Sequence, residues 1–152
     1  MGDVVDPRTR SRMMAGIQGK NTKQEVLVRS ALHRRGFRFH KNDPKLPGKP
    51  DIVLPRHSAI IECNGCFWHM HSCALFRLPA TNTEFWQQKL SHNRERDNKN
   101  LGKLHDAGWR TLVLWECALK GKDQQNFELV MERICKWIQS DDLTIEIMDP
   151  KA

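Results

Sequence analysis

The sequence has no apolar run that approaches the length of a membrane span, and it is short of acidic residues, with 18 Asp and Glu against 25 Lys and Arg. A membrane-spanning helix needs about 20 mostly apolar residues, so that class of protein is excluded. The N-terminus also has no apolar segment of the signal-peptide kind, and we therefore expect a cytoplasmic protein. Internal repeats, low-complexity segments and linkers are absent, so we expect the 152 residues to form one domain with a substantial core.

The formal net charge is +7. This excess of cations favours a polyanionic partner, with nucleic acid ahead of a membrane surface, although a merely soluble basic protein would show it too. The five cysteines are not expected to form disulfides in a reducing compartment. There, clustered Cys and His residues indicate metal ligands or catalytic groups.

Cysteine and histidine gather in one short stretch, Cys66-Phe-Trp-His-Met-His-Ser-Cys73. Thiolates and imidazoles are the preferred ligands of zinc, and Cys117 can join them only if the fold brings it in. A closed four-ligand site has no open position and is structural rather than catalytic. A cluster without zinc, or one that uses His69 or His105, stays an alternative. The set that would close a tetrahedral site is Cys66, His71, Cys73 and Cys117.

Apolar periodicity and capping signals predict alternating helices and strands. Capping boxes at Thr22–Glu25 and Thr81–Glu84 predict helices that run to about Arg35 and about Ala107, and a last helix is expected from Asp123. This order predicts an α/β or α+β domain whose helices cover a central sheet. The strand candidates are Phe37–His40, Asp51–Leu54, Ala59–Cys63, the interior strand Trp109–Trp115 and the edge strand Leu143–Ile147.

Residues 1–21 are basic and have little core pattern. Such a terminus is a disordered tail by default. Arg12 and Lys20, together with Met13 and Met14, favour instead an arm that becomes ordered on DNA, with its cations on phosphates and a methionine between bases.

Four polar residues are candidates for a hydrolytic site. Phosphodiester cleavage needs a neutralised phosphate, an activated water and a protonated leaving group. One or two Mg²⁺ ions held by carboxylates supply the first two, and Asp51 and Glu62 are placed for that on adjacent strands. His69 with Asp97 behind it would transfer a proton near neutral pH.

The surroundings of these residues leave two alternatives open. Glu25 either only completes its capping box, which the pattern favours, or adds a carboxylate to the site. Asn93 and Asp97 interrupt an apolar helix face, so that face either looks into a wet site or pairs its polar residues in the core. Strand alternation puts Glu62 and Asn64 on one face of the sheet.

Together these motifs resemble the very short patch repair endonucleases, relatives of the restriction enzymes with a PD-(D/E)xK core. The most characteristic match is Gly65-Cys-Phe-Trp-His69. Further matches run over nearly the whole chain: Ser11–Met14, Asn21–Lys23, Leu46–Val53, Thr81–Trp86, Asn93–Asp97, Gly108–Arg110 and Val113–Glu116.

The resemblance implies a restriction-endonuclease-like fold, a three-layer α/β/α core with a central mixed sheet and a zinc-tied loop. A single endonuclease domain of residues 22–152 would follow a basic arm of residues 1–21. The family nicks double-stranded DNA 5′ to the thymine of a T·G mismatch, the product of 5-methylcytosine deamination, and so initiates short-patch repair. We therefore expect mismatched DNA as partner, the DNA mismatch repair machinery as a candidate second partner, a monomer without membrane association, and location at the nucleoid when DNA is bound.

The resemblance also implies roles for single residues. Asp51 and the backbone carbonyl of Cys63 would bind Mg²⁺, and His69 would transfer the proton with support from Asp97 and Glu25. The ligands of a structural zinc would be Cys66, His71, Cys73 and Cys117. The side chains that would enter the base stack beside the mismatch are Phe67, Trp68 and Trp86 from the major groove and Met14 from the minor groove. Unstacking is cheapest where pairing is already poor, which would favour a mismatch.

Two positions depart from the family, which commonly has an apolar residue at Glu62 and His or Asp at Asn64. Glu62-Cys-Asn64 looks more like the (D/E)xK arm of the wider superfamily, so Glu62 is a candidate Mg²⁺ ligand and the role of Asn64 stays open. Two rival functions are a zinc-stabilised DNA-binding module without catalysis and a restriction-type nuclease with another target. The first would not need Asp51, Glu62, His69 and Asp97 together.

Overall fold

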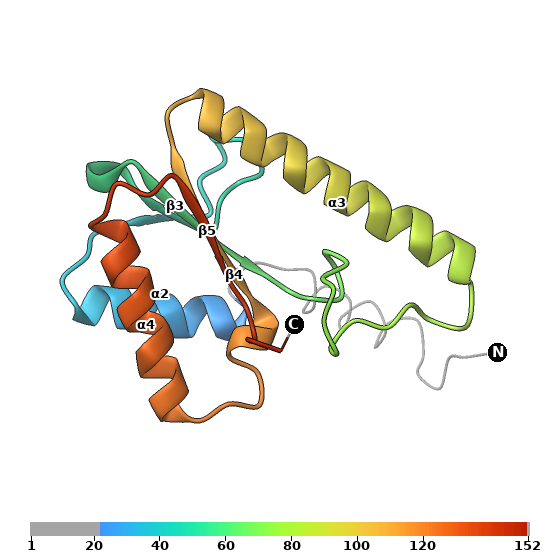
Figure 1. The fold of residues 1–152 in the computed structure, drawn as a ribbon. Coiled ribbons are helices and arrows are strands. Elements are labelled where there is room, and N and C mark those ends of the chain that lie inside the picture. Colours follow the sequence, from blue (N-terminus) through green and yellow to red (C-terminus); the bar gives the residue numbers. More distant parts are fainter. Residues whose placement is uncertain (1–21, 152) are drawn as a thin grey trace, which may run out of the picture.

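The computed structural model describes residues 22–151, and its elements follow the predicted order of helices and strands (Figure 1). None of the helices in that range is both long and apolar enough to cross a membrane. The helices are α2 (Lys23–Arg34), α3 (Thr83–Asp106) and α4 (Gln124–Ile138). The strands are β1 (His40–Lys41), β2 (Ile52–Leu54), β3 (Ala59–Asn64), β4 (Arg110–Trp115) and β5 (Thr144–Ile147). Short 3₁₀ helices, η1 (Pro55–His57) and η2 (Glu116–Ala118), follow β2 and β4.

The five strands form one mixed sheet in the order β1-β2-β3-β4-β5. β1, β2 and β3 pair antiparallel, whereas β3, β4 and β5 pair parallel, as expected where α3 or α4 lies between consecutive strands. β4 lies between β3 and β5, which confirms the interior position predicted from its continuous apolar run. The predicted strand Phe37–His40 is wrong in its bounds, because Phe37 and Phe39 pack against the core before the ladder begins at His40.

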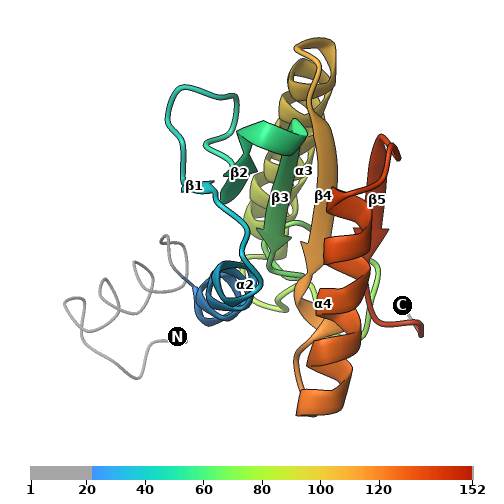
Figure 2. The same cartoon turned by 90° about the vertical axis from the view of Figure 1, so that its left-hand side faces the viewer.

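Helices cover both faces of the sheet, with α3 on one face and α2 and α4 on the other (Figures 1 and 2). Side chains along β3 point alternately to the two faces of the sheet. Ile61 packs into the core beneath α2 and α4, and Ile60 packs with Leu104 of α3. The same period brings Glu62 and Asn64 to one face of the sheet, as predicted, and this is the face that α3 covers. The architecture is a three-layer α/β/α sandwich with a mixed sheet, consistent with a restriction-endonuclease-like fold.

Two helices begin where the sequence predicts. The hydroxyl of Thr22 accepts a hydrogen bond from the amide of Glu25 (3.3 Å), and the carboxylate of Asp123 accepts one from the amide of Asn126 (2.8 Å). Each cap satisfies an amide that has no partner inside the helix.

The start of α3 differs from the prediction. Thr81 is not the N-cap; Asn82 takes that place with a φ of +56° and makes no side-chain hydrogen bond to the helix. Thr83 turns its hydroxyl back and donates to the carbonyl of Pro79 (2.8 Å), so the loop rather than a capping box fixes this end. At the other end, the helix stops before Gly108, whose φ of +92° is the left-handed backbone that its C-terminal signal predicted.

Candidate active site and metal centre

The parallel pairing of β3 with β4 assembles a cysteine cluster from residues that are far apart in the sequence. In this register Asn64 lies opposite Trp115, so both strands end at the same edge of the sheet. The chain leaves the two strands side by side, and Cys66 and Cys117, each two residues beyond the paired ends, come together. The fold thereby supplies Cys117 to the loop that holds the other candidate ligands.

The candidate ligand atoms of this cluster all lie within 4.8 Å of one another, and its members are Cys66, His71, Cys73 and Cys117. Residues 22–151 contain no second group of three or more such side chains this compact. Nδ1 of His71 is 3.6 Å from Sγ of Cys66 and 3.6 Å from Sγ of Cys117. Tetrahedral bonds of about 2.3 Å to sulfur and about 2.0–2.1 Å to nitrogen require an S···N separation of about 3.6 Å. The residues therefore fit a tetrahedral metal ion with Nδ1 of His71 as the imidazole ligand.

Burial favours the neutral forms of the side chains in this cluster. Burial raises the pKa of the Cys66 and Cys117 thiols and lowers the pKa of His71, because desolvation disfavours every charged form. A metal ion supplies the opposite charge that stabilises the thiolates. Two further hydrogen bonds hold the ligands: the Cys66 amide donates to Glu116 Oε1 (3.1 Å), and the Asp149 amide donates to Sγ of Cys117 (3.4 Å).

Two carboxylates lie on the α3 face near the same end of the sheet. Continuing the antiparallel β2–β3 register by one residue puts Asp51 beside Glu62. Burial raises the pKa of Asp51 to about 7, and the carboxylate of Glu25 adds to the rise. Burial also raises the pKa of Glu62 to about 8, with Asp51 as the next cause. Desolvated carboxylates that repel one another fit a divalent cation with oxygen ligands, such as Mg²⁺.

Glu25 belongs to this acidic group and does more than cap a helix. Its side chain is only 5% exposed, and Oε2 lies 3.3 Å from the guanidinium of Arg29, one turn along α2. Its charge acts on both Asp51 and Glu62, whose pKa values it raises. The structure thus brings the carboxylate of Glu25 close to the two candidate metal ligands, although the capping pattern favoured a role in the cap alone.

The polar residues of α3 reach the loop that carries the cysteines. Oδ2 of Asp97 contacts Nδ1 of His69, which fixes the hydrogen on Nδ1 and leaves Nε2 as the nitrogen available for proton transfer. Asn93, one turn earlier, donates from Nδ2 to the backbone carbonyl of Trp68 (3.3 Å). The face of α3 that carries Asn93 and Asp97 therefore points toward the candidate site, and its polar side chains do not pair with each other in the core.

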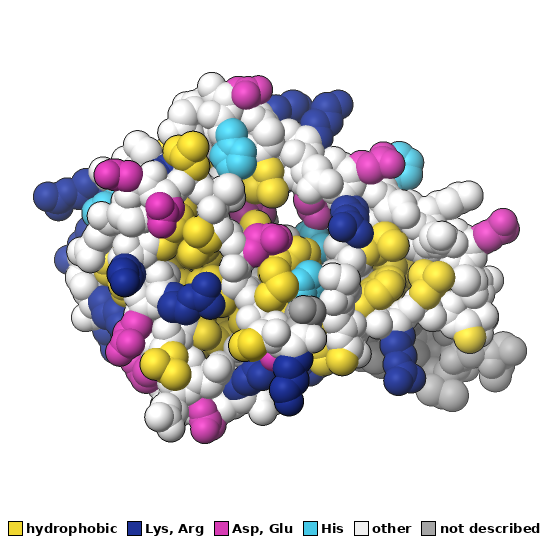
Figure 3. All heavy atoms as spheres, in the orientation of Figure 1, with side chains coloured by type: hydrophobic (Ala, Val, Ile, Leu, Met, Phe, Trp, Pro, Cys, Tyr) yellow, Lys and Arg dark blue, Asp and Glu magenta, His cyan; other side chains and the backbone are white. Residues whose placement is uncertain are grey.

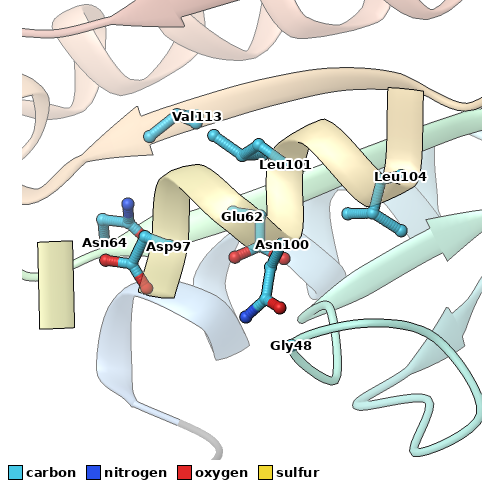
Figure 4. A pocket seen from close by; sticks show the side chains of 8 residues that line it. All are labelled: Gly48, Glu62, Asn64, Asp97, Asn100, Leu101, Leu104 and Val113. Carbon is cyan, nitrogen blue, oxygen red and sulfur yellow. The ribbon is translucent and has the colours of Figure 1, made fainter. Parts of the chain in front are cut away.

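A hollow with about 320 Å³ of empty space, which includes open solvent, lies between α3 and the α3 face of the sheet. Figure 4 shows Asn64 beside Asp97 and Glu62 beside Asn100. Gly48 approaches α3 so closely that a Cβ on it would lie 2.9 Å from Nδ2 of Asn100. The loop that leads to Asp51 is therefore packed against α3. The lining residues are Gly48, Glu62, Asn64, Asp97, Asn100, Leu101, Leu104 and Val113.

The three aromatic residues predicted to enter DNA form one partly exposed cluster. The ring of Phe67 is 5.1 Å from that of Trp68 and 5.6 Å from that of Trp86, and the two tryptophans are 5.9 Å apart. Phe85, 59% exposed, packs edge-on against Trp86. Figure 3 shows hydrophobic side chains gathered on this face along the N-terminal half of α3. A partly exposed aromatic group of this kind is typical of an interaction surface.

Comparison with known proteins identifies the family. The family model described as DNA mismatch endonuclease Vsr matches residues 2–75. The chain is 42% identical to the DNA mismatch endonuclease Vsr of Escherichia coli K12 over 147 residues, which is 97% of this chain and 94% of that protein. This chain belongs to the Vsr family of DNA mismatch endonucleases.

The chain is also similar to nicking enzymes. Over 122 residues the chain is 46% identical to the type II nicking enzyme V.NmeAIP of Neisseria meningitidis, covering 80% of this chain and 87% of that enzyme. Over 119 residues it is 40% identical to the type II nicking enzyme V.XorIIP of Xanthomonas oryzae, covering 78% and 88%. Membership supports a DNA endonuclease, a hydrolase with DNA as its partner, and suggests a divalent metal.

Some predicted residues of this Vsr-family chain are not described by the structure, and some residues near the site were not predicted. Arg12, Met14 and Lys20 lie outside the described residues, so their contacts with DNA stay predictions. Trp115 and Glu116 belong to a motif for which no role was predicted, although they directly precede the candidate metal ligand Cys117. Their position next to Cys117 was the sequence signal that could have indicated a place near the cysteine cluster. No sequence signal indicated Asn100 or Asp149.

Proposed function

We propose that this Vsr-family chain is a Mg²⁺-dependent DNA mismatch endonuclease that nicks duplex DNA 5′ to the thymine of a T·G mismatch. The T·G pair would arise from 5-methylcytosine deamination, and the nick would initiate short-patch repair. The observation that carries the proposal is the pairing of His69 with Asp97 at the end of the sheet that holds the half-buried carboxylate of Asp51. The name of the Escherichia coli relative supports a mismatch as the substrate.

The residues divide the hydrolytic work. Asp51, the backbone carbonyl of Cys63 and Glu62 would hold Mg²⁺, which supplies charge neutralisation on the phosphate and lowers the pKa of a bound water. The Cys63 amide orients the carboxylate of Asp51. Asp97 keeps the hydrogen on Nδ1 of His69, so that Nε2 can exchange a proton with a reacting oxygen.

The cysteine cluster would hold a structural zinc. Three thiolates with one imidazole are a ligand set that zinc prefers, and a closed tetrahedron leaves no position for substrate. The ion would tie down the loop that carries Phe67, Trp68 and His69, and so would hold the aromatic residues and the proton-transfer group in one rigid piece.

The aromatic cluster would read the mismatch by unstacking it. Phe67, Trp68 and Trp86 would enter the base stack from the major groove. Opening a base step costs a few kcal/mol and costs less where pairing is weak, so a T·G pair is favoured over a matched pair.

The test is a nicking assay on strand-labelled duplexes that differ only in one pair: T·G, C·G, T·A and other mismatches, each with and without Mg²⁺. We expect cleavage of the thymine strand alone, 5′ to the thymine of T·G, and only with Mg²⁺. Binding without cleavage of any strand would indicate a zinc-stabilised DNA-binding module. Equal cleavage of matched duplexes would indicate a restriction-type nuclease with another target.

A further inference from the structure

Trp115 contacts both His69, a candidate for proton transfer, and His71, a candidate metal ligand. Its side chain is buried, with 8% exposed, at the end of β4. Its ring stacks on the ring of His71, with centroids 4.0 Å apart and planes at 11°. The same indole meets His69 edge to face, with centroids 6.2 Å apart and planes at 77°. One tryptophan therefore contacts both a metal-cluster residue and the imidazole that pairs with Asp97.

The indole itself is held in place from the sheet. Nε1 of Trp115 donates to Oε1 of Glu146 on the neighbouring strand β5 (3.1 Å). Parallel pairing puts Glu146 opposite Val113, and alternation carries its side chain to the same face as Trp115. The indole also packs with Cys66, Val113 and Cys117 in one buried cluster. A strand with these contacts is a more rigid support than a loop.

His69 depends on such support because its own backbone is irregular. Between His69 and His71 the chain passes through Met70, whose φ of +50° lies in the left-handed region that non-glycine residues seldom adopt. This reversal sends His69 toward α3 and His71 into the cysteine cluster. The orientation of the His69 ring is therefore set by side-chain contacts, with Asp97 at Nδ1 and Trp115 against the ring.

We propose that Trp115 is a positioning residue for proton transfer: by stacking on His71 and packing against His69, it makes the orientation of His69 depend on assembly of the cysteine cluster. The role of His69 rests on the proposed function. Misplacing a reacting group by about 1 Å can lower a rate by ~100-fold. Loss of the indole should therefore lower kcat and leave KM, which reports DNA binding by other residues, nearly unchanged.

The experiment compares substitutions at two buried tryptophans in zinc-loaded protein. Trp115→Leu removes the aromatic plane, and Trp115→Phe keeps a plane but loses the N–H. Trp137→Leu is the matched control, because Trp137 is 3% exposed but lies on α4, in the core on the opposite face of the sheet. We expect kcat for T·G nicking to fall ~10- to 100-fold in Trp115→Leu, to recover most of its value in Trp115→Phe, and to change little in Trp137→Leu at a temperature where all three are folded.

A second readout does not depend on activity. In ¹⁵N-histidine-labelled protein, the His69 imidazole should give one sharp set of resonances in wild type and Trp137→Leu, and broadened or doubled resonances in Trp115→Leu, with zinc content unchanged. If wild type nicks T·G but Trp115→Leu matches Trp137→Leu in kcat and keeps sharp His69 resonances, the positioning role is wrong and the proposed function stands. If wild type does not nick, the proposed function fails, and the resonances alone decide whether Trp115 orders His69. If Trp115→Leu does not fold, Trp115→Phe decides. A kcat as low as that of a His69→Ala variant, together with broadened or doubled His69 resonances in Trp115→Phe, would overturn the role assigned to the aromatic plane.

Discussion

The backbone amide of Cys63 donates a 2.7 Å hydrogen bond to the carboxylate of Asp51. The carbonyl of the same residue is a proposed Mg²⁺ ligand, so one residue of β3 would both orient the first ligand and supply the second. The β2 ladder ends at Ile61, so the Cys63 amide is available to Asp51, while the backbone of Cys63 stays in register with Leu114 of β4. A strand held in this way suits a hydrolytic site, since a metal bound by few protein ligands relies on their prior placement.

Glu62→Gln should raise the Mg²⁺ concentration needed for half-maximal nicking several-fold. The substitution removes a hard anionic oxygen beside Asp51 and keeps the volume of the side chain. The measurement is a Mg²⁺ titration of nicking rates, with Glu95→Gln as the control, because Glu95 is exposed on α3. A Glu62→Gln curve that overlays the wild-type curve would reject Glu62 as a ligand.

The Mg²⁺-free protein should lose stability as the pH rises toward 8. The pKa values of Asp51 and Glu62 are raised to about 7 and about 8, so the folded state binds these protons more tightly than the unfolded state. Their contribution to stability is full at pH values below about 4 and is lost as the pH rises through 7 and 8. Added Mg²⁺ should restore it.

The measurement for this pH effect is urea unfolding at several pH values between 6 and 8.5, in zinc-loaded protein with and without Mg²⁺. The double variant Asp51→Asn, Glu62→Gln is the control, because it removes both titrating groups. The Mg²⁺-free wild type should show the steeper fall; equal slopes for the two proteins would contradict the shifted pKa values.

Purified protein should contain about one tightly bound zinc. The Cys73→Ala variant should bind no zinc and should no longer show a cooperative unfolding transition. The metal is bound only by the folded chain, so its binding free energy contributes to folding. Cys135→Ala is the matched control, since Cys135 lies outside the cluster on α4 and should keep the metal. Elemental analysis that finds no zinc in well-folded wild type would contradict the assignment.

Trp68→Ala should weaken discrimination between T·G and C·G duplexes more than it weakens the fold. Trp68 packs in the partly exposed aromatic cluster, so its loss should lower the free energy of unfolding by only ~1 kcal/mol, whereas Trp137→Ala in the core should cost ~3–5 kcal/mol. Binding to both duplexes and thermal unfolding are measured side by side. A Trp68→Ala protein that melts much earlier yet discriminates normally would make Trp68 a core residue.

Local periodicity predicted the parts of the site that belong to single elements. Alternation along β3 placed Glu62 and Asn64 on one face of the sheet, which the structure shows to be the α3 face, and helical spacing placed Asp97 on the helix face that meets His69. Each of these predictions needed only the identity of the element and its period, which the apolar residues reveal.

What local patterns could not predict depends on strand register and on loop geometry, and for Cys117 and Glu25 only the family resemblance implied it. The approach of Cys117 to Cys66 follows from the parallel pairing of Asn64 with Trp115, which no local pattern encodes. The buried position of Glu25 beside Asp51 is a tertiary contact that the capping pattern hides. The N-terminus of α3 was misplaced because its loop offered a capping box that the structure does not use.

Single-turnover nicking of a T·G duplex by Asp51→Asn, measured together with its affinity for the same duplex, tests the central claim most directly. The account predicts an affinity close to that of wild type and nicking reduced to background at saturating Mg²⁺, because the substitution removes a metal ligand and leaves the aromatic cluster and the cysteine cluster intact. Nicking at a rate near wild type would contradict the claim that the buried end of β2 and β3 is the hydrolytic centre.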